Sequence, residues 1–225
     1  MKQPPQIIIE TLEQEILAQG FLGIDRRRVK IVYPKDGPVF YEDAIMTVDS
    51  VVRKSNDAVA IVPYFILNSE VYVYLRSCLR PAAMLRNYYE DSGREQDGVN
   101  FGFWEIPAGL IDPNEAGLSG CVDAAIRELH EEIGILVSFS DIDVLGPRYF
   151  SSAGMCAERI WFFDAKVNPL MQDIPGEDGS PLERAGEILA ITLKEALKAI
   201  DKEEILDAKT QMGLMRLARK LKIEY

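Results

Sequence analysis

The sequence offers few residues that could bind a metal ion through nitrogen or sulfur. Its 225 residues include one histidine, and its three cysteines are Cys78, Cys121 and Cys156. The cysteines are scattered, odd in number and without the paired spacing of zinc ligands, so we expect reduced thiols in the core. Zinc sites and disulfide bonds are therefore not expected.

Basic residues are also in the minority. Lysine and arginine total 25 against 36 aspartates and glutamates, which gives a formal net charge of −11 at pH 7. Because nucleic-acid backbones attract lysine and arginine, this balance argues against a nucleic-acid partner. It does not exclude a small anionic substrate, since bound Mg²⁺ would reverse the local sign of the charge.

Long apolar runs are missing as well. No stretch approaches the length of a membrane span, and residues 1–20 lack the apolar core of a signal peptide. We therefore expect a cytoplasmic protein with no membrane partner. The chain is 48% hydrophobic and 27% charged, which is ordinary for a globular protein of one domain with elaborations or one domain with an arm.

The most informative feature of the sequence is a motif in two segments, rich in glutamate. E-I-P-A-G-L-I-D-P-N-E fills residues 105–115, and R-E-L-H-E-E-I-G-I follows at residues 127–135. On a helix Glu128 and Glu132 lie one above the other, with Glu131 beside them. They flank a core-facing stripe formed by Val122, Ile126, Leu129 and Ile133. A carboxylate pair in that position could chelate a hard divalent cation and leave ligand positions open.

The same glutamates have an ordinary interpretation. Acidic residues on a helix are usually solvated, and Arg127 with Glu131 could form a simple i,i+4 ion pair. The context favours a site. Gly134 stands where a left-handed helix cap is expected, and Pro107-Ala108-Gly109 interrupts the chain after a strand-like segment at residues 101–106.

Elsewhere, apolar spacing predicts helices over residues 7–22 and 208–221. Strands are expected over residues 39–53, 57–67, 70–79, 159–167 and 186–193, with a hairpin turn at residues 54–57 between the first two. Residues 86–100 and 170–181 are expected to be loops, and the run Arg26-Arg27-Arg28 is left unassigned. Strands around helices without regular βα alternation indicate an α+β fold, an α/β/α sandwich.

The motif at residues 105–135 resembles the Nudix box of the Nudix hydrolases. Nine positions match that pattern in residue type: Gly109, Glu115, Arg127, Glu128, Leu129, Glu131, Glu132, Gly134 and Ile135. One spacing departs, because eleven residues instead of seven separate Glu115 from Arg127. We interpret the difference as a four-residue insertion in a loop around residues 116–120, before the helix starts. The insertion leaves the placement of Glu115 open.

Further segments resemble the branch that hydrolyses ADP-ribose and nucleotide sugars. They are residues 54–62, 79–81, 105–109, 149–158 and 187–193. The resemblance implies an α/β/α Nudix domain over residues 41–225, with residues 1–40 as an extension of helix or strand. It also implies a homodimer in which the N-terminal strands help to build the partner's site. The implied reaction is Mg²⁺-dependent cleavage of a nucleoside diphosphate sugar to a nucleoside monophosphate and a sugar phosphate.

The resemblance also assigns roles to residues. Glu128, Glu132 and the carbonyl group of Ala108 would bind Mg²⁺, or Mn²⁺ in its place. Arg127 would hold the glutamates, with Glu131 close to the metal. A loop glutamate would act as the general base. Glu187 fits the branch best, Glu183 is the second choice, and Glu177 is a third loop glutamate.

Substrate contacts are implied for five residues. They are Arg80, Glu105, Glu158, Asp207 and Lys209. Arg80 would bind the diphosphate or simply cap a strand end, and Trp104 would stack on a base or belong to the core. Asp207 and Lys209 match an element of nucleotide-sugar hydrolases, although they also suit the start of any helix.

The loop Ser151-Ser152-Ala153-Gly154 is a candidate substrate loop, but the branch usually has proline where Ala153 stands. That departure argues against strict ADP-ribose specificity. Two other functions stay open. One is hydrolysis of another nucleotide, such as a dinucleotide cofactor or a dinucleoside polyphosphate. The other is a sensor that binds a nucleotide sugar without cleaving it.

Overall fold

The computed structural model describes residues 7–34, 42–53, 55, 57–84, 102–176 and 186–224. Contacts between Cα atoms divide the chain into two compact units. The first comprises Met1–Asn56 and Phe150–Glu158, and the second comprises Asp57–Tyr149 and Arg159–Tyr225. The predicted division of the chain at residue 40 falls inside the first unit, between its second and third strands.

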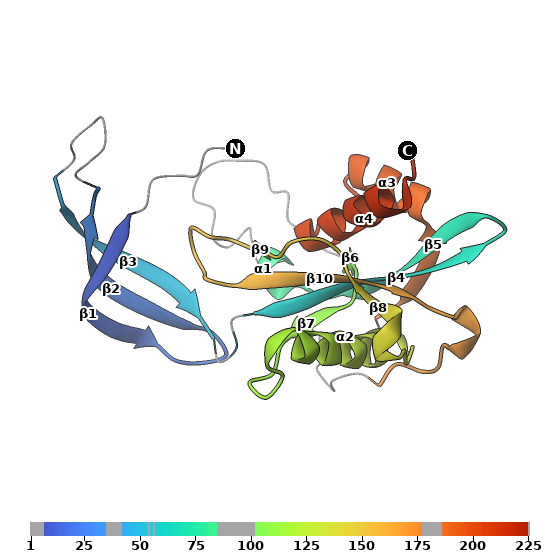
Figure 1. Ribbon diagram of the computed structural model, residues 1–225, viewed down its shortest axis with the longest axis horizontal. Coiled ribbons are helices and arrows are strands. Elements are labelled where there is room, and N and C mark those ends of the chain that lie inside the picture. The colour runs from blue at the N-terminus through green and yellow to red at the C-terminus, as the bar shows by residue number, and fades with distance from the viewer. Residues whose placement is uncertain are drawn as a thin grey trace. The chain divides into compact units, whose positions relative to one another are not determined.

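The first unit is built on a three-stranded antiparallel sheet (Figure 1). Its strands follow the chain in the order β1 (Ile8–Ala18), β2 (Gly23–Val32) and β3 (Ala44–Val52). The helix predicted over residues 7–22 is therefore wrong. Isoleucine and threonine, which favour strands, recur in this segment, and pairing with β2 along its whole length overrides the helical spacing.

The run Arg26-Arg27-Arg28 lies within β2, and each of its arginines has a carboxylate partner. Arg26 binds Asp49 of β3 through two hydrogen bonds of 2.7 Å. Arg27 binds Asp25 within β2, and Arg28 binds Glu13 of β1 at 3.1 Å. The pairs of Arg26 and Arg28 are surface pairs that join β2 to its two neighbours, and each adds little to stability.

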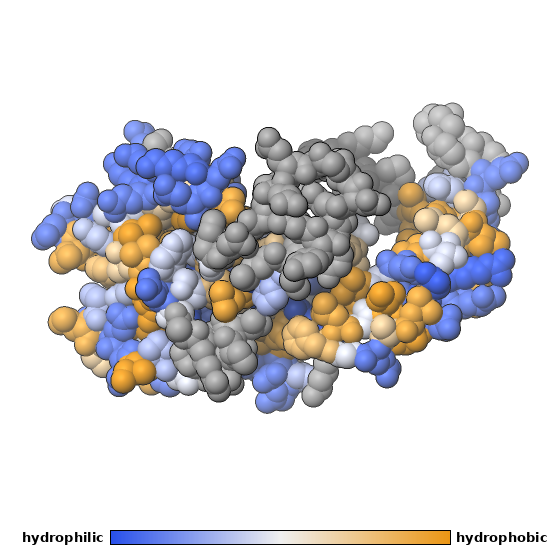
Figure 2. All heavy atoms as spheres, turned by 180° about the vertical axis from the view of Figure 1, so that it is seen from behind, coloured by the Kyte–Doolittle hydropathy of each residue, from blue (hydrophilic) through white to orange (hydrophobic). Residues whose placement is uncertain are grey.

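Large apolar side chains remain exposed along the three strands. Figure 2 shows apolar residues (orange) at the surface of the molecule next to hydrophilic ones (blue). On this sheet the exposed apolar residues include Ile8, Ile9, Leu12, Ile16, Leu17, Ile45, Met46 and Val48. A surface of this kind commonly marks an interaction site.

The second unit contains a mixed sheet with the strand order β11-β5-β4-β10-β8, to which β6, β7 and β9 add short pairings. The central strand β4 runs parallel to β10 and antiparallel to β5, and its first eight residues are buried. The strands are β4 (Ala58–Leu67), β5 (Glu70–Cys78), β6 (Phe103–Glu105), β7 (Ala108–Leu110), β8 (Ile142–Val144), β9 (Tyr149–Phe150), β10 (Arg159–Lys166) and β11 (Ile188–Thr192).

Helices cover both faces of this sheet, with α2 on one side and α3 and α4 on the other (Figure 1). Each side has its own apolar core: Leu129 and Ile133 of α2 pack on Val59 and Ile61, whereas α3 and α4 pack around Phe162. The helical segments are α1 (Pro81–Met84), α2 (Gly117–Ile133), α3 (Leu193–Asp201) and α4 (Ala208–Leu221), with 3₁₀ turns η2 (Phe139–Asp141) and η3 (Pro169–Met171). The predicted α/β/α arrangement is confirmed.

The hairpin predicted around residues 54–57 is wrong. β3 pairs with β2, and β4 pairs with β5, β7 and β10, so the chain leaves one sheet at residue 52 and enters the other at residue 58. Residues of the kind found in turns do not specify which strands pair, because pairing depends on contacts distant in sequence. The predicted loop at residues 86–100 lies outside the described residues.

Candidate active site

Helix α2 presents its glutamates as its spacing predicts. Val122, Leu129 and Ile133 are buried against the sheet, and Gly134 ends the helix with a φ of 70°. The helix begins at Gly117, so most of the segment predicted as an inserted loop at residues 116–120 forms its first turn instead. Gly120 makes this possible, because a Cβ atom there would lie 2.1 Å from the backbone of Glu115.

Glu128 and Glu132 are buried at the edge of the core, each with 6% of its surface exposed. The backbone of β7 comes very close to the first of them. A Cβ atom on Gly109 would lie 1.9 Å from Oε1 of Glu128, so glycine is required if that carboxylate is to stay where it is. The Glu131 side chain is more open, at 30% exposure.

Arg127 gathers three carboxylates. Its Nη1 donates to Glu128 at 2.5 Å and to Glu131 at 3.2 Å. Its Nε and Nη2 each donate to Glu115 at 3.3 Å. Nη2 also donates to the carbonyl of Leu110 at 2.9 Å. Glu115 therefore joins the cluster in spite of the longer spacing that precedes α2.

The charges in this cluster do not balance. Burial disfavours the charged guanidinium, but the hydrogen bond that it donates to Glu115 and the charge of Glu128 outweigh burial and raise the pKa of Arg127 above its ordinary value. One permanent cation thus faces Glu115, Glu128 and Glu131, with the buried Glu132 one turn beyond Glu128. The surplus of negative charge suits a cation.

The strand register indicates where the carbonyl of Ala108 points. Ile61 donates to the carbonyl of Pro107 at 2.9 Å, and Ile111 donates to Asp57 at 3.1 Å, so the odd-numbered residues of this segment bond to β4. Carbonyls of alternate residues point to the same side of a strand. The carbonyls of Ala108 and Leu110 therefore both face away from β4, and that of Leu110 reaches Arg127 of α2.

These groups fit a hard divalent cation in their chemistry. Glu128, Glu132 and the Ala108 carbonyl supply only oxygen, which is the donor that Mg²⁺ and Mn²⁺ accept. Within the described ranges, no three side chains of histidine, cysteine, aspartate or glutamate stand together as a ready metal site. Arg127 binds the carboxylates of both Glu128 and Glu131.

The carbonyl end of α2 is held from outside the helix. Arg76 of β5 donates through Nη1 to the carbonyls of Glu132 at 2.6 Å and Glu131 at 3.3 Å, and only 1% of its surface is exposed. We did not single out Arg76 from the sequence. The available signal was an arginine inside the alternating strand E-V-Y-V-Y-L-R-S-C-L, since a charge in a buried strand needs a specific partner.

A second cluster forms around Glu105, which is 2% exposed. Arg80 donates to both of its oxygens at 2.6 Å, and Lys209 donates to Oε2. Asp207 binds Lys209 at 3.0 Å and also caps α4, because its carboxylate accepts from the backbone and hydroxyl of Thr210. The helix-start interpretation of Asp207 is therefore confirmed, and the predicted contact of Asp207 and Lys209 with a substrate stays a prediction.

Electrostatics hold this second cluster in its charged form. Burial would raise the pKa of Glu105, but its hydrogen bond to Arg80 and the charge of Lys209 prevail and lower the pKa. Burial likewise opposes the charge on Lys209, but Glu105 and Asp207 raise its pKa. Cys78 lies between the two clusters. Burial, followed by the charges of Glu132 and Glu105, raises the pKa of Cys78 to about 12.

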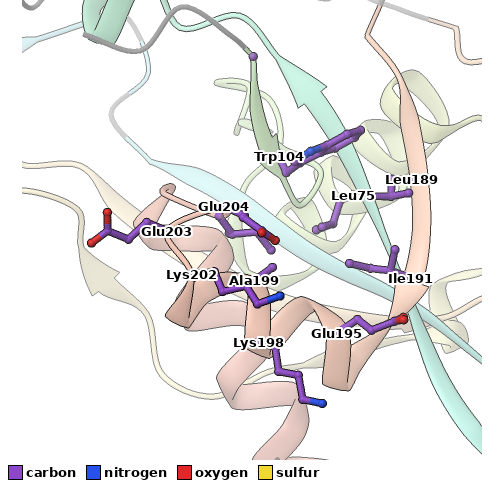
Figure 3. Close-up of a pocket in the computed structure, with 12 residues that line it drawn as sticks. Leu75, Trp104, Leu189, Ile191, Glu195, Lys198, Ala199, Lys202, Glu203 and Glu204 are labelled. Carbon is purple, nitrogen blue, oxygen red and sulfur yellow. The ribbon is translucent and has the colours of Figure 1, made fainter. Parts of the chain in front are cut away.

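Beside Glu105, Trp104 lines a cavity of about 600 Å³ on the face of the sheet covered by α3. Figure 3 shows the apolar side chains of Leu75, Leu189 and Ile191 between the Trp104 indole and that helix. Trp104 is half-buried and packs on the core, which confirms the second of the roles considered for it, and stacking on a base stays a prediction. The indole supplies a flat apolar wall to the cavity.

The remaining sequence candidates fall in different places. The carbonyl of Glu187 accepts from the backbone amide of Ser77, and the amide of Glu187 donates to the Ser77 hydroxyl. Strand alternation places its side chain on the face of Leu189, opposite Ile188, which packs on the α2 side. Glu158 binds Arg53 within the first unit. Glu177 and Glu183 lie outside the described residues.

Three comparisons bear on this arrangement. The model of the NUDIX domain matches residues 90–208, more than half of the chain. Among 145 matching solved chains is one titled "Crystal structure of ADP compounds hydrolase". It superimposes with a TM-score of 0.63 over 98% of this chain and 95% of its own, at 18% identity, so the likeness carries the fold alone. No curated protein matches the sequence.

Among the described helices, none is both long and apolar enough to cross a membrane.

Proposed function

The chain belongs to the Nudix family, and from that premise we propose that it hydrolyses the diphosphate bond of nucleoside diphosphate sugars. The products are a nucleoside monophosphate and a sugar phosphate. The observation that carries the proposal is the clamp of Arg127 on Glu115, Glu128 and Glu131, with Glu132 buried beside it. This arrangement concentrates carboxylates in one place, which supports the binding of a divalent cation.

Glu128, Glu132 and the Ala108 carbonyl would hold Mg²⁺, or Mn²⁺ in its place. When bound, the cation supplies positive charge to the diphosphate and lowers the pKa of water. Arg127 keeps the carboxylates of Glu128 and Glu131 in place. A diphosphate resists hydrolysis because its oxygens repel nucleophiles, so positioning and charge neutralisation are the main requirements.

The general base would be a glutamate of the segment before β11. Glu187 and Glu183 are both candidates. The alternation of β11 directs the side chain of Glu187 to the sheet face opposite α2, so we propose Glu183, the second choice from the sequence, as the first candidate to be tested. Substitution of each glutamate by glutamine separates the two assignments.

Substrate binding would involve the Glu105 cluster. Arg80 is half-exposed and held at a fixed angle by Glu105, so its open face suits a phosphate oxygen. Lys209 and Asp207 would contact the sugar side of the substrate, and Trp104 would offer a flat wall to the base.

We further propose a homodimer formed through the three-stranded sheet. Its exposed isoleucines and leucines, which include Ile8, Ile9 and Leu12, support an interface on that surface. Sedimentation velocity tests this proposal. A fully active monomer at assay concentration would contradict it.

The first experiment is a panel of ADP-ribose, other ADP compounds, UDP-glucose, GDP-mannose and diadenosine polyphosphates, with and without Mg²⁺. Metal-dependent cleavage of several nucleotide sugars, lost in Glu132→Gln at saturating Mg²⁺, supports the proposal. Cleavage only of dinucleoside polyphosphates would reassign the substrate. Saturable binding of a nucleotide sugar without cleavage would make the protein a sensor. Wild-type turnover by Glu132→Gln would remove the proposed metal site.

A further inference from the structure

The last turn of α2 receives hydrogen bonds from two other parts of the chain. The final four carbonyls of an α-helix have no partner within the helix. In α2 they belong to residues 130–133, and each accepts a bond from outside the helix. The donors are the Gly176 amide to His130 at 3.4 Å, Arg76 to Glu131 at 3.3 Å and to Glu132 at 2.6 Å, and the Gln172 side chain to Ile133 at 3.3 Å.

Such support has a physical reason. Glu131 and Glu132 stand at the negative end of the helix dipole, where carboxylates are unfavourable. They also lie within one turn of Glu128, so like charges repel. The last turn of α2 therefore tends to fray at the point where the proposed metal ligands need a fixed position.

Arg76 opposes that tendency more directly than the other donors. Its strand is fixed in the sheet, because Arg76 stands opposite Ile188 of β11 on one side and Glu105 of β6 on the other. Its positive charge meets the negative end of the helix, and its shortest bond is to the carbonyl of Glu132 itself. The backbone of a proposed metal ligand is thereby tied to the sheet.

We propose that Arg76 is a positioning residue for cation binding, acting through the backbone of Glu131 and Glu132. This inference rests on the proposed function, because it assumes that Glu132 binds a divalent cation. Substitution of this buried side chain of β5 should weaken metal binding, and a loss of fold stability alone should not account for that weakening. The role assigned to Arg76 is exerted through the two carbonyls to which its side chain donates.

The chain provides a matched control in Arg216 of α4. Its Nη1 also donates to two carbonyls, at 3.3 Å to Leu145 and 2.7 Å to Pro147. It stacks over Phe162, on the face of the sheet opposite α2. Substitution of Arg216 therefore removes the same kind of hydrogen bonds without touching the helix that carries the glutamates.

The test measures Mn²⁺ binding to the full chain by electron paramagnetic resonance, together with thermal unfolding in the absence of metal. We expect Arg76→Gln to weaken Mn²⁺ binding about tenfold, the scale on which groups that orient metal ligands act. Arg76→Lys, which keeps the charge but not the planar fork, should weaken it by less. Arg216→Gln should lower the unfolding temperature and bind Mn²⁺ like the wild type.

Equal Mn²⁺ affinity in Arg76→Gln, Arg216→Gln and wild type would overturn the inference and leave the proposed function intact. If Arg76→Gln does not fold, Arg76→Lys decides: weakened binding supports the inference, and wild-type binding overturns it. Glu132→Gln tests the proposed metal site itself, separately from the role of Arg76. If it binds Mn²⁺ as the wild type does, the proposed metal site fails and the inference with it.

Discussion

Arg80 grips the carboxylate of Glu105 with two parallel hydrogen bonds, from Nε and Nη2, each 2.6 Å long. Lys209 binds the same carboxylate. One buried glutamate is therefore the partner of two cations, Arg80 just after β5 and Lys209 in α4. Because both cations depend on this acid, Glu105 links the two residues proposed to bind substrate, Arg80 and Lys209, to the stability of the second unit.

Glu105→Gln should destabilise the fold by about 3 kcal/mol near neutral pH, because it leaves the buried ammonium of Lys209 with less compensation. The effect should depend on pH. A carboxyl whose folded-state pKa lies below its ordinary value of 4.5 contributes stability above that pH and loses it as the pH falls through the folded pKa. The difference between variant and wild type should therefore shrink in acid. Urea unfolding at a series of pH values measures it, and a constant difference would contradict the role of the charge.

Gly109→Ala should affect activity more than stability. The new methyl group would overlap the Glu128 carboxylate, which lies at the end of a flexible side chain and can move away. We expect turnover to fall by about 10- to 100-fold, as when groups that orient metal ligands are lost.

Gly213→Ala is the contrasting variant. A Cβ atom there would lie 2.8 Å from Ile106 and 3.0 Å from Val62 in the packed core. It should cost about 1–3 kcal/mol of stability with little change in turnover of the folded enzyme. Thermal unfolding and kcat of both variants make the comparison, and equal effects on kcat would contradict the special role of Gly109.

Glu115 and Arg127 should show energetic coupling in a double-mutant cycle. Their hydrogen bonds of 3.3 Å connect the turn before α2 to the helix. We expect the cycle of Glu115→Gln and Arg127→Gln to give a coupling of about 1 kcal/mol in unfolding free energy. Strict additivity would show that the longer segment before α2 has detached Glu115 from the cluster in solution.

Glu183→Gln should reduce kcat more than Glu187→Gln. Loss of a general base costs about 10²- to 10⁴-fold, whereas Glu187 is expected to act mainly through its backbone bonds to Ser77. Measurement of kcat at saturating Mg²⁺ decides between them. A larger loss in Glu187→Gln would restore the assignment suggested by the sequence resemblance.

Some of these features were predictable because they depend on residues close together in sequence. The periodicity of residues 122–133 predicted which side of α2 is buried, and Gly134 predicted where it ends. Strand alternation predicted β5 and β10, and the amphipathic spacing of residues 208–221 predicted α4. In each case a local period matches the geometry of one element.

Other features depended on contacts that no local pattern encodes. Residues 7–22 have helical spacing, yet β2 offers a paired strand and the segment extends. The segment before α2 was expected to be a loop because of its glycines, yet Gly120 lets the Glu115 turn pack against a longer helix. Arg76 was overlooked because its partners, the carbonyls of Glu131 and Glu132, lie more than fifty residues away.

The sequence by itself determined the family of this protein and the chemical type of its site, because the box motif confines an arginine and three glutamates to two turns of one helix. Only the tertiary structure decided how those charges are held. The grip of Arg127 on Glu115, the pairing of Glu105 with Lys209 and the reach of Arg76 to the end of α2 each join segments from different elements. A folded chain brings such segments together to bury apolar surface, and the polar partners are then fixed by where the core places them.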